Sequence, residues 1–213
     1  ILSERANVFQ LKGFKDGWFE VQDASSQKVA PFLDVHPGQR VIDACAGAGG
    51  KALHLSALME NKGQLIALDV FDHKLKTLKL RARRAGAHNI ETRTIDSSKV
   101  IKKLHRSADR VLIDAPCTGL GVLRRNPDAK WKIDAQFLER VVQTQKEILT
   151  SYAQMVKPEG KLVYATCSIL PQENEQQVAY FLASEEGQAF KLINQQHLYP
   201  STDQYDGFFM ALF

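Results

Sequence analysis

The alternation of short apolar runs with longer segments of helical periodicity is the feature that most constrains the fold. The apolar runs have the length and composition of buried strands, at residues 40–44, 64–70, 89–95, 110–115, 161–166 and, later in the chain, 207–213. Helical segments fall between them, which is typical of βαβ units. The sequence therefore predicts an α/β fold, with a mostly parallel sheet covered by helices on both faces.

Three of the predicted helices have recognisable end signals. Asp72 is predicted to cap a helix that ends at Gly86. Asp134 is predicted to cap a longer helix whose apolar stripe reaches Val156. Pro171 suits the first turn of a third helix.

Composition suits a single domain in a reducing compartment. The chain has 213 residues, of which 44% are hydrophobic, enough for a large buried core. No run suggests a membrane span or a signal peptide, so we expect a cytoplasmic protein without a membrane partner. Cys45, Cys117 and Cys167 form no Cys-x-x-Cys pair, and we expect free thiols and no metal. The first residue is Ile1, so we expect a fragment of a longer protein, with residues 1–16 as an N-terminal extension or a remnant of a linker.

Positive charge is concentrated in two parts of the chain. The formal net charge is only +4, but residues 72–106 hold eleven Lys or Arg against three Asp or Glu. This segment is either a solvated helix face or a surface for nucleic acid. Arg124 and Arg125 form a second cluster soon after Cys117, where we interpret them as contacts to phosphate.

A glycine-rich turn follows the first predicted strand. It comprises Cys45, Ala46, Gly47, Ala48, Gly49, Gly50 and Lys51, and it leads into a helix. Glycines allow a ligand to approach the backbone, and the free N–H groups at a helix N-terminus face it. The turn fits the loose dinucleotide fingerprint but not the phosphate-binding P-loop, because Cys45 replaces its first glycine and Ala52 its Ser or Thr.

Carboxylates end the next predicted strands. Asp69 ends the second strand, where it can accept hydrogen bonds from ribose hydroxyls, and Asp96 ends the third, where it can bind an adenine amino group. Each could instead cap a helix or turn, but together with the glycine turn they indicate a nucleoside pocket. An adenosyl ligand without a pyrophosphate would be S-adenosylmethionine, although the pattern also allows NAD.

Two cysteines emerge at the ends of buried strands, Cys117 in Asp114-Ala115-Pro116-Cys117 and Cys167 in Thr166-Cys167-Ser168. Chemistry in an open parallel sheet gathers at the carboxyl ends of its strands, so two thiols there can share one substrate. A thiolate is a strong nucleophile at neutral pH. Single free cysteines are more often core residues, but the nearby Asp114 and the glycine turn favour a reactive pair.

With these motifs the chain resembles the Nol-Nop-Sun family of RNA cytosine-5 methyltransferases, and within it the branch of the bacterial small-subunit ribosomal RNA methyltransferase B. The resemblance runs from about Gly17 to Phe213. Its marks are the segment 19–27, the glycine turn, the two cysteine motifs, residues 124–128 with Trp131, Glu173-Asn174-Glu175, and residues 206–209.

The resemblance implies a Rossmann-like S-adenosylmethionine-dependent methyltransferase fold, with a mostly parallel sheet and a late antiparallel strand, as a catalytic domain over residues 17–213. It implies that the glycine turn, with Asp69, Asp96 and Asp114, binds S-adenosylmethionine. The family turn usually reads Ala-Pro-Gly-Gly-Lys-Thr, whereas this chain has a more flexible Gly47-Ala48 version. Members of this branch also carry an upstream RNA-binding domain that is absent from this sequence.

The resemblance assigns Cys167 as the nucleophile and Cys117 as the second catalytic cysteine. Addition of a thiolate to carbon 6 of cytosine makes carbon 5 able to attack a sulfonium methyl group. Asp114 is then expected to hydrogen-bond the base, and Lys51 either to orient Asp114 and favour the thiolate or to form a purely structural pair.

We expect the substrate to be single-stranded or looped RNA, since a stacked base cannot be reached. The resemblance implies that this RNA is 16S ribosomal RNA. A transfer RNA substrate, an NAD-dependent oxidoreductase and a non-catalytic RNA-binding fragment are the alternatives.

Overall fold

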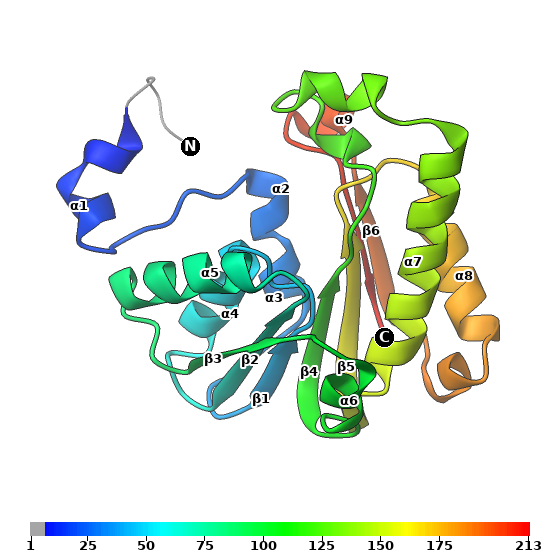
Figure 1. The fold of residues 1–213 in the computed structure, drawn as a ribbon, viewed down its shortest axis with the longest axis horizontal. Coiled ribbons are helices and arrows are strands. Elements are labelled where there is room, and N and C mark those ends of the chain that lie inside the picture. The colour runs from blue at the N-terminus through cyan, green and yellow to red at the C-terminus, as the bar shows by residue number, and fades with distance from the viewer. Residues whose placement is uncertain (1–6) are drawn as a thin grey trace.

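The computed structural model describes residues 7–213, so residues 1–6 of the predicted N-terminal extension lie outside the described residues. All six predicted strands are present in one seven-stranded sheet of order β3-β2-β1-β4-β5-β7-β6 (Figure 1). Their bounds are β1 Arg40–Asp43, β2 Gln64–Asp69, β3 Ile90–Thr94, β4 Ala108–Asp114, β5 Val156–Thr166, β6 Asn194–Leu198 and β7 Phe208–Leu212. Strands β1 to β5 pair in parallel, and β7 runs antiparallel to β5 and β6, which confirms the predicted sheet and its late antiparallel strand.

Strand β6 is the one strand of this sheet that the sequence does not indicate. Its residues read Asn-Gln-Gln-His-Leu, and only Leu198 is buried. The strand lies at the sheet edge and pairs only with β7. Backbone hydrogen bonds on one side hold it, so no apolar run marks it in the sequence.

The helices cover both faces of the sheet. The α-helices are α1 Lys12–Lys15, α2 Ala24–Gln27, α3 Val29–Phe32, α4 Gly50–Leu58, α5 Asp72–Arg84, α6 Ser98–Lys102, α7 Ala135–Ala153, α8 Glu175–Ala183 and α9 Pro200–Asp203. Short 3-10 helices are η1 Val8–Gln10, η2 Leu120–Val122, η3 Pro127–Trp131, η4 Pro171–Glu173 and η5 Glu186–Ala189.

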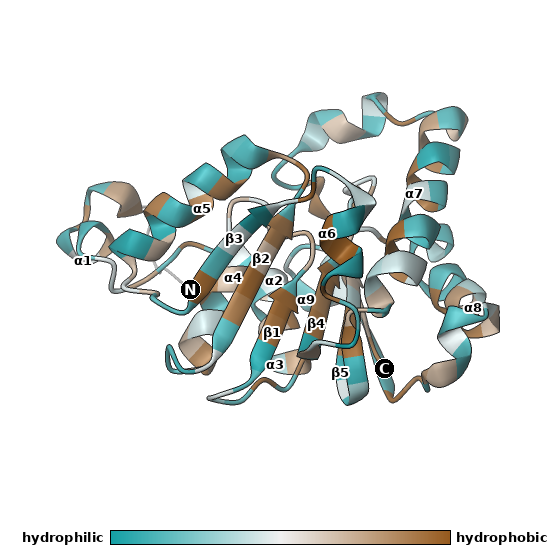
Figure 2. Ribbon diagram, turned by 60° about the horizontal axis from the view of Figure 1, so that its bottom comes forward, coloured by the Kyte–Doolittle hydropathy of each residue, from teal (hydrophilic) through white to brown (hydrophobic). Residues whose placement is uncertain are grey.

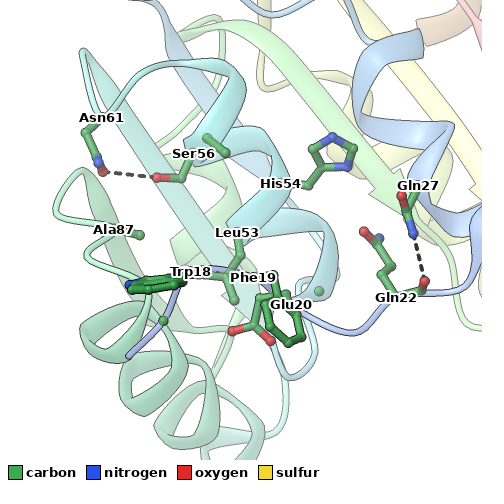
Figure 3. Close-up of a pocket in the computed structure, with 14 residues that line it drawn as sticks. Trp18, Phe19, Glu20, Gln22, Gln27, Leu53, His54, Ser56, Asn61 and Ala87 are labelled. Atoms are coloured by element: carbon green, nitrogen blue, oxygen red, sulfur yellow. Dashed lines mark hydrogen bonds between the residues drawn. The ribbon is translucent and has the colours of Figure 1, made fainter. Parts of the chain in front are cut away.

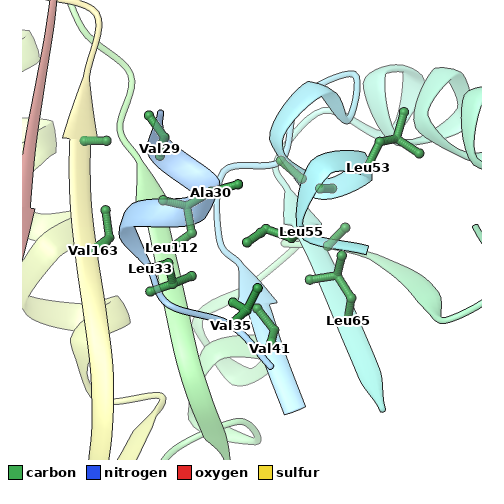
Figure 4. Close-up of a cluster of buried hydrophobic side chains, with 14 of the residues drawn as sticks. Val29, Ala30, Leu33, Val35, Val41, Leu53, Leu55, Leu65, Leu112 and Val163 are labelled. Atoms are coloured by element: carbon green, nitrogen blue, oxygen red, sulfur yellow. The ribbon is translucent and has the colours of Figure 1, made fainter. Parts of the chain in front are cut away.

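Neighbouring residues of each central strand enter different halves of the core, as the twofold period of a strand requires. Val41, Leu65 and Leu112 pack with α3, α4 and α5, and Figure 4 shows the part of this cluster around α3 and α4. The residues that follow them in the chain, including Ile42 and Ile113, pack with α6, α7 and α8. Apolar residues accordingly dominate β1, β2 and β4 in Figure 2, because helices bury these strands on both sides.

One predicted helix cap is confirmed and one is wrong. The side chain of Asp134 accepts a hydrogen bond of 2.7 Å from the Phe137 N–H and caps α7. Asp72 is instead the first residue of α5, and it pairs with Lys76 one turn later at 2.7 Å. An acidic residue in the first turn still suits the helix dipole, so the sequence signal was correct and the capping role was not.

Two predicted helix bounds are also wrong. Val156 begins β5 rather than ending α7, because the chain turns after Ala153 and pairs with β4 through a register shift. The apolar pattern continues across this turn, and periodicity alone cannot distinguish the two elements. Pro171 begins η4, which Asn174 separates from α8, so it does not lie in the first turn of the longer helix.

The sheet order places the expected site at a topological switch point. The chain moves outward from β1 to β2 and β3, then returns past β1 to β4 and β5. The loops that follow β1 and β4 therefore diverge above adjacent strands, and ligands bind in the crevice between such loops. The loop after β5 lies beside that after β4, because Asp114 and Ala165 are paired across the two strands.

Candidate active site

The two cysteines lie together at the carboxyl ends of β4 and β5. The Cys117 and Cys167 sulfurs are 3.1 Å apart, although 50 positions separate the residues in sequence. Both side chains are partly buried and both thiols are free. The paired strand ends therefore bring the two predicted reactive residues into direct contact.

The environment gives the two thiols different acidities. The hydrogen bond to Cys167 is the main cause that raises the pKa of Cys117 well above its ordinary value, with burial acting in the same direction. The pKa of Cys167 is lowered, mainly by the same hydrogen bond and also by the charge of Lys51, against the effects of burial and Asp114. The opposed pKa shifts favour Cys117 as the donor of this hydrogen bond and Cys167 as the sulfur that carries negative charge more readily.

Lys51 and Asp114 form an ion pair beside the cysteines. The Lys51 Nζ donates a hydrogen bond of 2.7 Å to Oδ2 of Asp114, which joins the first turn of α4 to the end of β4. Burial by itself would lower the pKa of Lys51, but the charge and hydrogen bond of Asp114 outweigh it and the pKa is raised. Lys51 thus supplies a fixed positive charge close to Cys167.

The glycine turn connects β1 to the N-terminus of α4. Gly49 has φ of 92°, and a Cβ there would lie 2.5 Å from Leu78 Cγ, so glycine is required on both grounds. No side chain among the described residues caps α4, which leaves its N-terminal N–H groups directed toward the site. Arg81 donates a hydrogen bond of 2.7 Å to the carbonyl of Ala48 and so fixes the turn to α5.

Asp69, the last residue of β2, contacts this turn through a hydrogen bond, whereas Asp96 stands apart. The carboxylate of Asp69 accepts a 2.8 Å hydrogen bond from the Gly47 N–H and another of 2.8 Å from the Phe71 N–H. Each oxygen keeps a further lone pair for a ligand. Asp96 follows β3 at the same edge of the sheet, is exposed, and accepts a hydrogen bond from Ser97.

The remaining predicted residues of the turn contribute backbone rather than side chains. Ala46 accepts a hydrogen bond from the Gly49 N–H at 2.9 Å, and a Cβ on Gly50 would meet open space. Burial raises the pKa of Cys45 well above its ordinary value, so this thiol is no candidate nucleophile.

Two buried carboxylates were not indicated as site residues by the sequence. Asp43, at the end of β1, is 0% exposed, and neither of its oxygens has a hydrogen-bond partner among residues 7–213. Glu173 is also 0% exposed and accepts hydrogen bonds from residues next to both cysteines. Asp43 stands directly before the glycine turn, the one local signal available, while only the tertiary structure reveals the contacts of Glu173.

Arg125, interpreted from the sequence as a phosphate contact, is exposed but already paired with a carboxylate. Both its Nε and Nη2 donate to the buried carboxylate of Asp206, 81 positions later. The charge that a phosphate would meet is thus already paired. Arg124 is exposed and donates to the backbone carbonyl of Gln204, and the nearby Trp131 is 79% exposed.

Other features of the described chain lie outside this site. A hollow of about 340 Å³ lies between the N-terminal segment around Trp18 and helix α4, and neither Cys117 nor Cys167 lines it (Figure 3). Among residues 7–213, no three or more His, Cys, Asp or Glu side chains are arranged to hold a metal ion. Nor does any helix in this range combine the length and apolar character needed to cross a bilayer.

Known proteins are similar to this chain in sequence and in fold. The model of the family described as 16S rRNA methyltransferase RsmB/F matches residues 30–213. The ribosomal RNA small subunit methyltransferase B of Proteus mirabilis is 37% identical over 211 residues, which are 99% of this chain and 49% of that protein. This chain therefore spans about half the length of that curated relative.

Solved structures agree. The crystal structure of PH0851 has a TM-score of 0.92 and 34% identity, covering 98% of this chain and 50% of that one. NSun6 from Pyrococcus horikoshii, solved with SFG, has a TM-score of 0.88 and 28% identity, covering 98% and 56%. These likenesses confirm the predicted Rossmann-like methyltransferase fold, and the chain belongs to the 16S rRNA methyltransferase RsmB/F family.

Proposed function

We propose that this chain is an S-adenosylmethionine-dependent RNA cytosine-5 methyltransferase that acts on 16S ribosomal RNA through a covalent bond between Cys167 and cytosine. The contact between the Cys117 and Cys167 sulfurs, at 3.1 Å with opposed pKa shifts, is the observation that carries the proposal. Direct methyl transfer to a ring nitrogen or a ribose oxygen has no need of two thiols in contact. A carbon that must first be activated by addition needs one nucleophilic thiol, and a second thiol in contact with it can assist release.

The residues at the switch point fit the cofactor. The N-terminus of α4 and the carboxylate of Asp69 suit a nucleoside with a short polar tail, and open space beside Gly47 and Gly50 leaves the backbone accessible. We propose that the turn from Cys45 to Lys51, with Asp69, Asp96 and Asp114, holds the cofactor. The related NSun6 was solved with SFG, an analogue of S-adenosylmethionine. When bound, this cofactor supplies the methyl group as part of a positively charged sulfonium.

The cysteines divide the remaining chemistry. The Cys167 thiolate adds to carbon 6 of cytosine, which places electron density on carbon 5 and lets that carbon take the methyl group. Removal of the carbon-5 proton then re-forms the double bond and expels the Cys167 sulfur as a thiolate. Cys117, which holds its own proton more tightly, lies 3.1 Å away and assists proton transfer and release.

Asp114 and Lys51 act on the base and on the thiolate. Asp114 is partly exposed at the end of β4, where its free oxygen can accept a hydrogen bond from the amino group of cytosine, and from the ring nitrogen when that nitrogen is protonated. Lys51 holds that carboxylate in place and favours the negative charge on Cys167. Membership of the RsmB/F family and the paired cysteines favour this activity over an NAD-dependent oxidoreductase and over a non-catalytic RNA-binding fragment.

Methyl transfer from labelled S-adenosylmethionine tests the proposal. The chain is incubated with unmodified 16S ribosomal RNA, and the RNA is digested to nucleosides; a transfer RNA pool and a Cys167→Ala variant are the controls. We expect the native chain to produce labelled 5-methylcytidine in 16S RNA, and we expect no label with the Cys167→Ala variant or in the transfer RNA pool. Label only in transfer RNA would overturn the substrate, and label in any other nucleoside would overturn the chemistry.

A further inference from the structure

The loops that carry the two cysteines are joined by one buried carboxylate. Glu173 ends η4, the short helix that follows the Cys167 loop, and its side chain points back between the loops. Oε1 accepts a hydrogen bond of 2.8 Å from the Thr118 N–H, and Oε2 accepts from the hydroxyls of Thr118, at 2.5 Å, and Ser168. These donors are the immediate neighbours of Cys117 and Cys167.

The same carboxylate also reaches helix α7. Gln145 donates a 3.0 Å hydrogen bond to Oε1 of Glu173 and one of 2.9 Å to the carbonyl of Pro116. Pro116 precedes Cys117, so the backbone is held on both sides of this cysteine. Glu173 and Gln145 are both 0% exposed, and the hydrogen bonds therefore do not compete with water.

The backbone around Cys167 is held in a similar way. Asn174, next to Glu173, donates a 3.1 Å hydrogen bond to the carbonyl of Ser168, and its Oδ1 accepts one of 2.6 Å from Thr166. The carbonyl of Cys167 itself accepts from the Gly121 N–H at 2.9 Å. The Glu-Asn pair thus ties down the residues on both sides of the second cysteine.

All four hydrogen bonds to the Glu173 carboxylate come from uncharged donors. Burying a carboxylate without a cation is costly, and a neutral side chain could join these loops at lower cost. The negative charge of Glu173 acts on the nearby thiol of Cys117. The charge of Glu173 is among the causes that raise the pKa of Cys117, whereas the charge of Lys51 is among the causes that lower the pKa of Cys167.

We infer that Glu173 is a positioning residue that fixes the two cysteine loops at their contact distance and keeps the proton on Cys117 rather than Cys167. The inference rests on the proposed function for its catalytic meaning, since only a reaction that uses both sulfurs needs this asymmetry. Glu173 does not touch the substrate. It acts through Thr118 and Ser168 on geometry and through its charge on the site of protonation.

Two substitutions separate geometry from charge. In Glu173→Gln the amide oxygen can still accept hydrogen bonds from Thr118 and Gln145, and the amide nitrogen can donate to the two hydroxyls. The hydrogen bonds that join the two cysteine loops are therefore kept, and the negative charge is lost. In Glu173→Ala both are lost. Glu175→Gln is the matched control, because Glu175 lies two positions on, pairs with His197 and has no hydrogen bond to either cysteine loop.

Alkylation by iodoacetamide, read by peptide mass spectrometry, tests the inference without RNA or cofactor. We expect the native chain and Glu175→Gln to be modified severalfold faster at Cys167 than at Cys117, in the order that the directions of the two pKa shifts favour. Glu173→Gln should reduce this preference severalfold. It should also move the pH profile of Cys117 alkylation to lower pH, because it removes a charge that raises the pKa of Cys117. The Asp114 and Lys51 charges, which also act on Cys167, are unchanged in every variant.

Turnover supplies the second readout. Glu173→Ala should lower kcat about 100-fold, the effect of a displacement of about 1 Å in reacting groups, while the affinity for S-adenosylmethionine stays the same. Glu173→Gln should have a kcat between those of Glu173→Ala and the native chain, because it keeps the hydrogen bonds between the two cysteine loops. Ser168→Ala, which removes a single donor, gives a smaller change in the same direction should Glu173→Ala fail to fold.

The outcomes separate this inference from the proposed function. Unchanged alkylation preference in Glu173→Gln, with kcat near that of the native chain, would overturn the inference and leave the methyltransferase proposal intact. Altered alkylation in a chain that forms no 5-methylcytidine would overturn the proposed function and support the positioning role. A lower melting temperature with native alkylation preference would reduce Glu173 to a structural residue.

Discussion

The Nζ atom of Lys51 lies 2.7 Å from Oδ2 of Asp114 and connects the glycine turn after β1 with the strand end that precedes Cys117. The residues are 63 positions apart. This contact holds in place the Lys51 charge, which is among the causes that lower the pKa of Cys167. Loss of this contact should change the reactivity of Cys167, which can be measured without RNA or cofactor.

Replacing Lys51 with Met should make Cys167 less reactive at neutral pH. The substitution removes a charge that lowers the pKa of Cys167 and leaves Asp114, whose charge raises it, without its cation. The pH profile of Cys167 alkylation by iodoacetamide should therefore move to higher pH. Lys161→Met is the control, because Lys161 lies in the middle of β5 and pairs at 2.7 Å with Asp34 rather than with Asp114. A profile shared by all three proteins would mean that the Lys51–Asp114 pair is only structural.

The two cysteines should fail in different ways when each is replaced. Without the Cys167 thiolate no bond to carbon 6 can form, so Cys167→Ala should give neither 5-methylcytidine nor an RNA adduct on a denaturing gel. Cys117→Ala should form the adduct and release it slowly, so the adduct accumulates. Exchanged phenotypes would invert the two roles, and full product formation by both variants would refute the covalent mechanism.

Asp69→Ala should weaken S-adenosylmethionine binding by about 2 kcal/mol, the scale of a lost charge-assisted hydrogen bond. The structure adds a second reason, because the carboxylate also orders the turn through the Gly47 N–H. Titration calorimetry measures the effect. Glu91→Gln, on the exposed part of β3, serves as the comparison and should bind as the native chain does. Native affinity in Asp69→Ala would remove Asp69 from the cofactor site.

Asp43 should make stability depend on pH between about 4 and 7. Burial, with the nearby charge of Asp114, raises the pKa of Asp43 to about 7 from an ordinary value of 3.8. In this window the folded state keeps a proton that the unfolded state loses, so the free energy of unfolding falls as pH rises.

The effect of Asp43 is seen by comparing Asp43→Asn with the native chain in urea unfolding at pH 5 and pH 8. The asparagine cannot ionise, so its stability relative to the native chain should improve by about 2 kcal/mol between the two pH values. An equal pH dependence in both proteins would show that Asp43 is not protonated in the folded state near neutral pH.

Arg125→Ala should destabilise the fold rather than act mainly on RNA binding. It leaves the carboxylate of Asp206, 2% exposed, without its partner, and an unsatisfied buried acceptor costs about 1–3 kcal/mol. The melting temperature should fall, and Asp206→Asn in the same chain should restore part of it. Arg124→Ala, whose side chain holds only a backbone carbonyl, should instead flatten the salt dependence of RNA binding. The reverse pattern would return Arg125 to the RNA surface.

Sequence patterns alone predict the strands and turns that form the site. Strands β1, β2 and β4 and the part of β5 from Leu162 to Thr166 are buried on both faces, so each contains a continuous apolar run. Because parallel strands end at one edge, the residues after those runs, including Asp69, Asp114 and Cys167, could be assigned to one site before any contact was known. Local patterns were less informative where the chain pairs through its backbone alone, as in β6, or turns without a composition change, as at Val156.

The packing of distant segments sets which of these groups are in contact. The sulfur contact joins residues 50 positions apart, Glu173 and Thr118 are 55 apart, and Arg125 and Asp206 are 81 apart. Periodicity and turn signals depend on residues within a few positions of one another, so they contain no information on such pairs. Which cysteine keeps its proton, and which arginine is already neutralised, follow from burial and from charges brought in by distant segments, and these exist only once the sheet and its loops have packed.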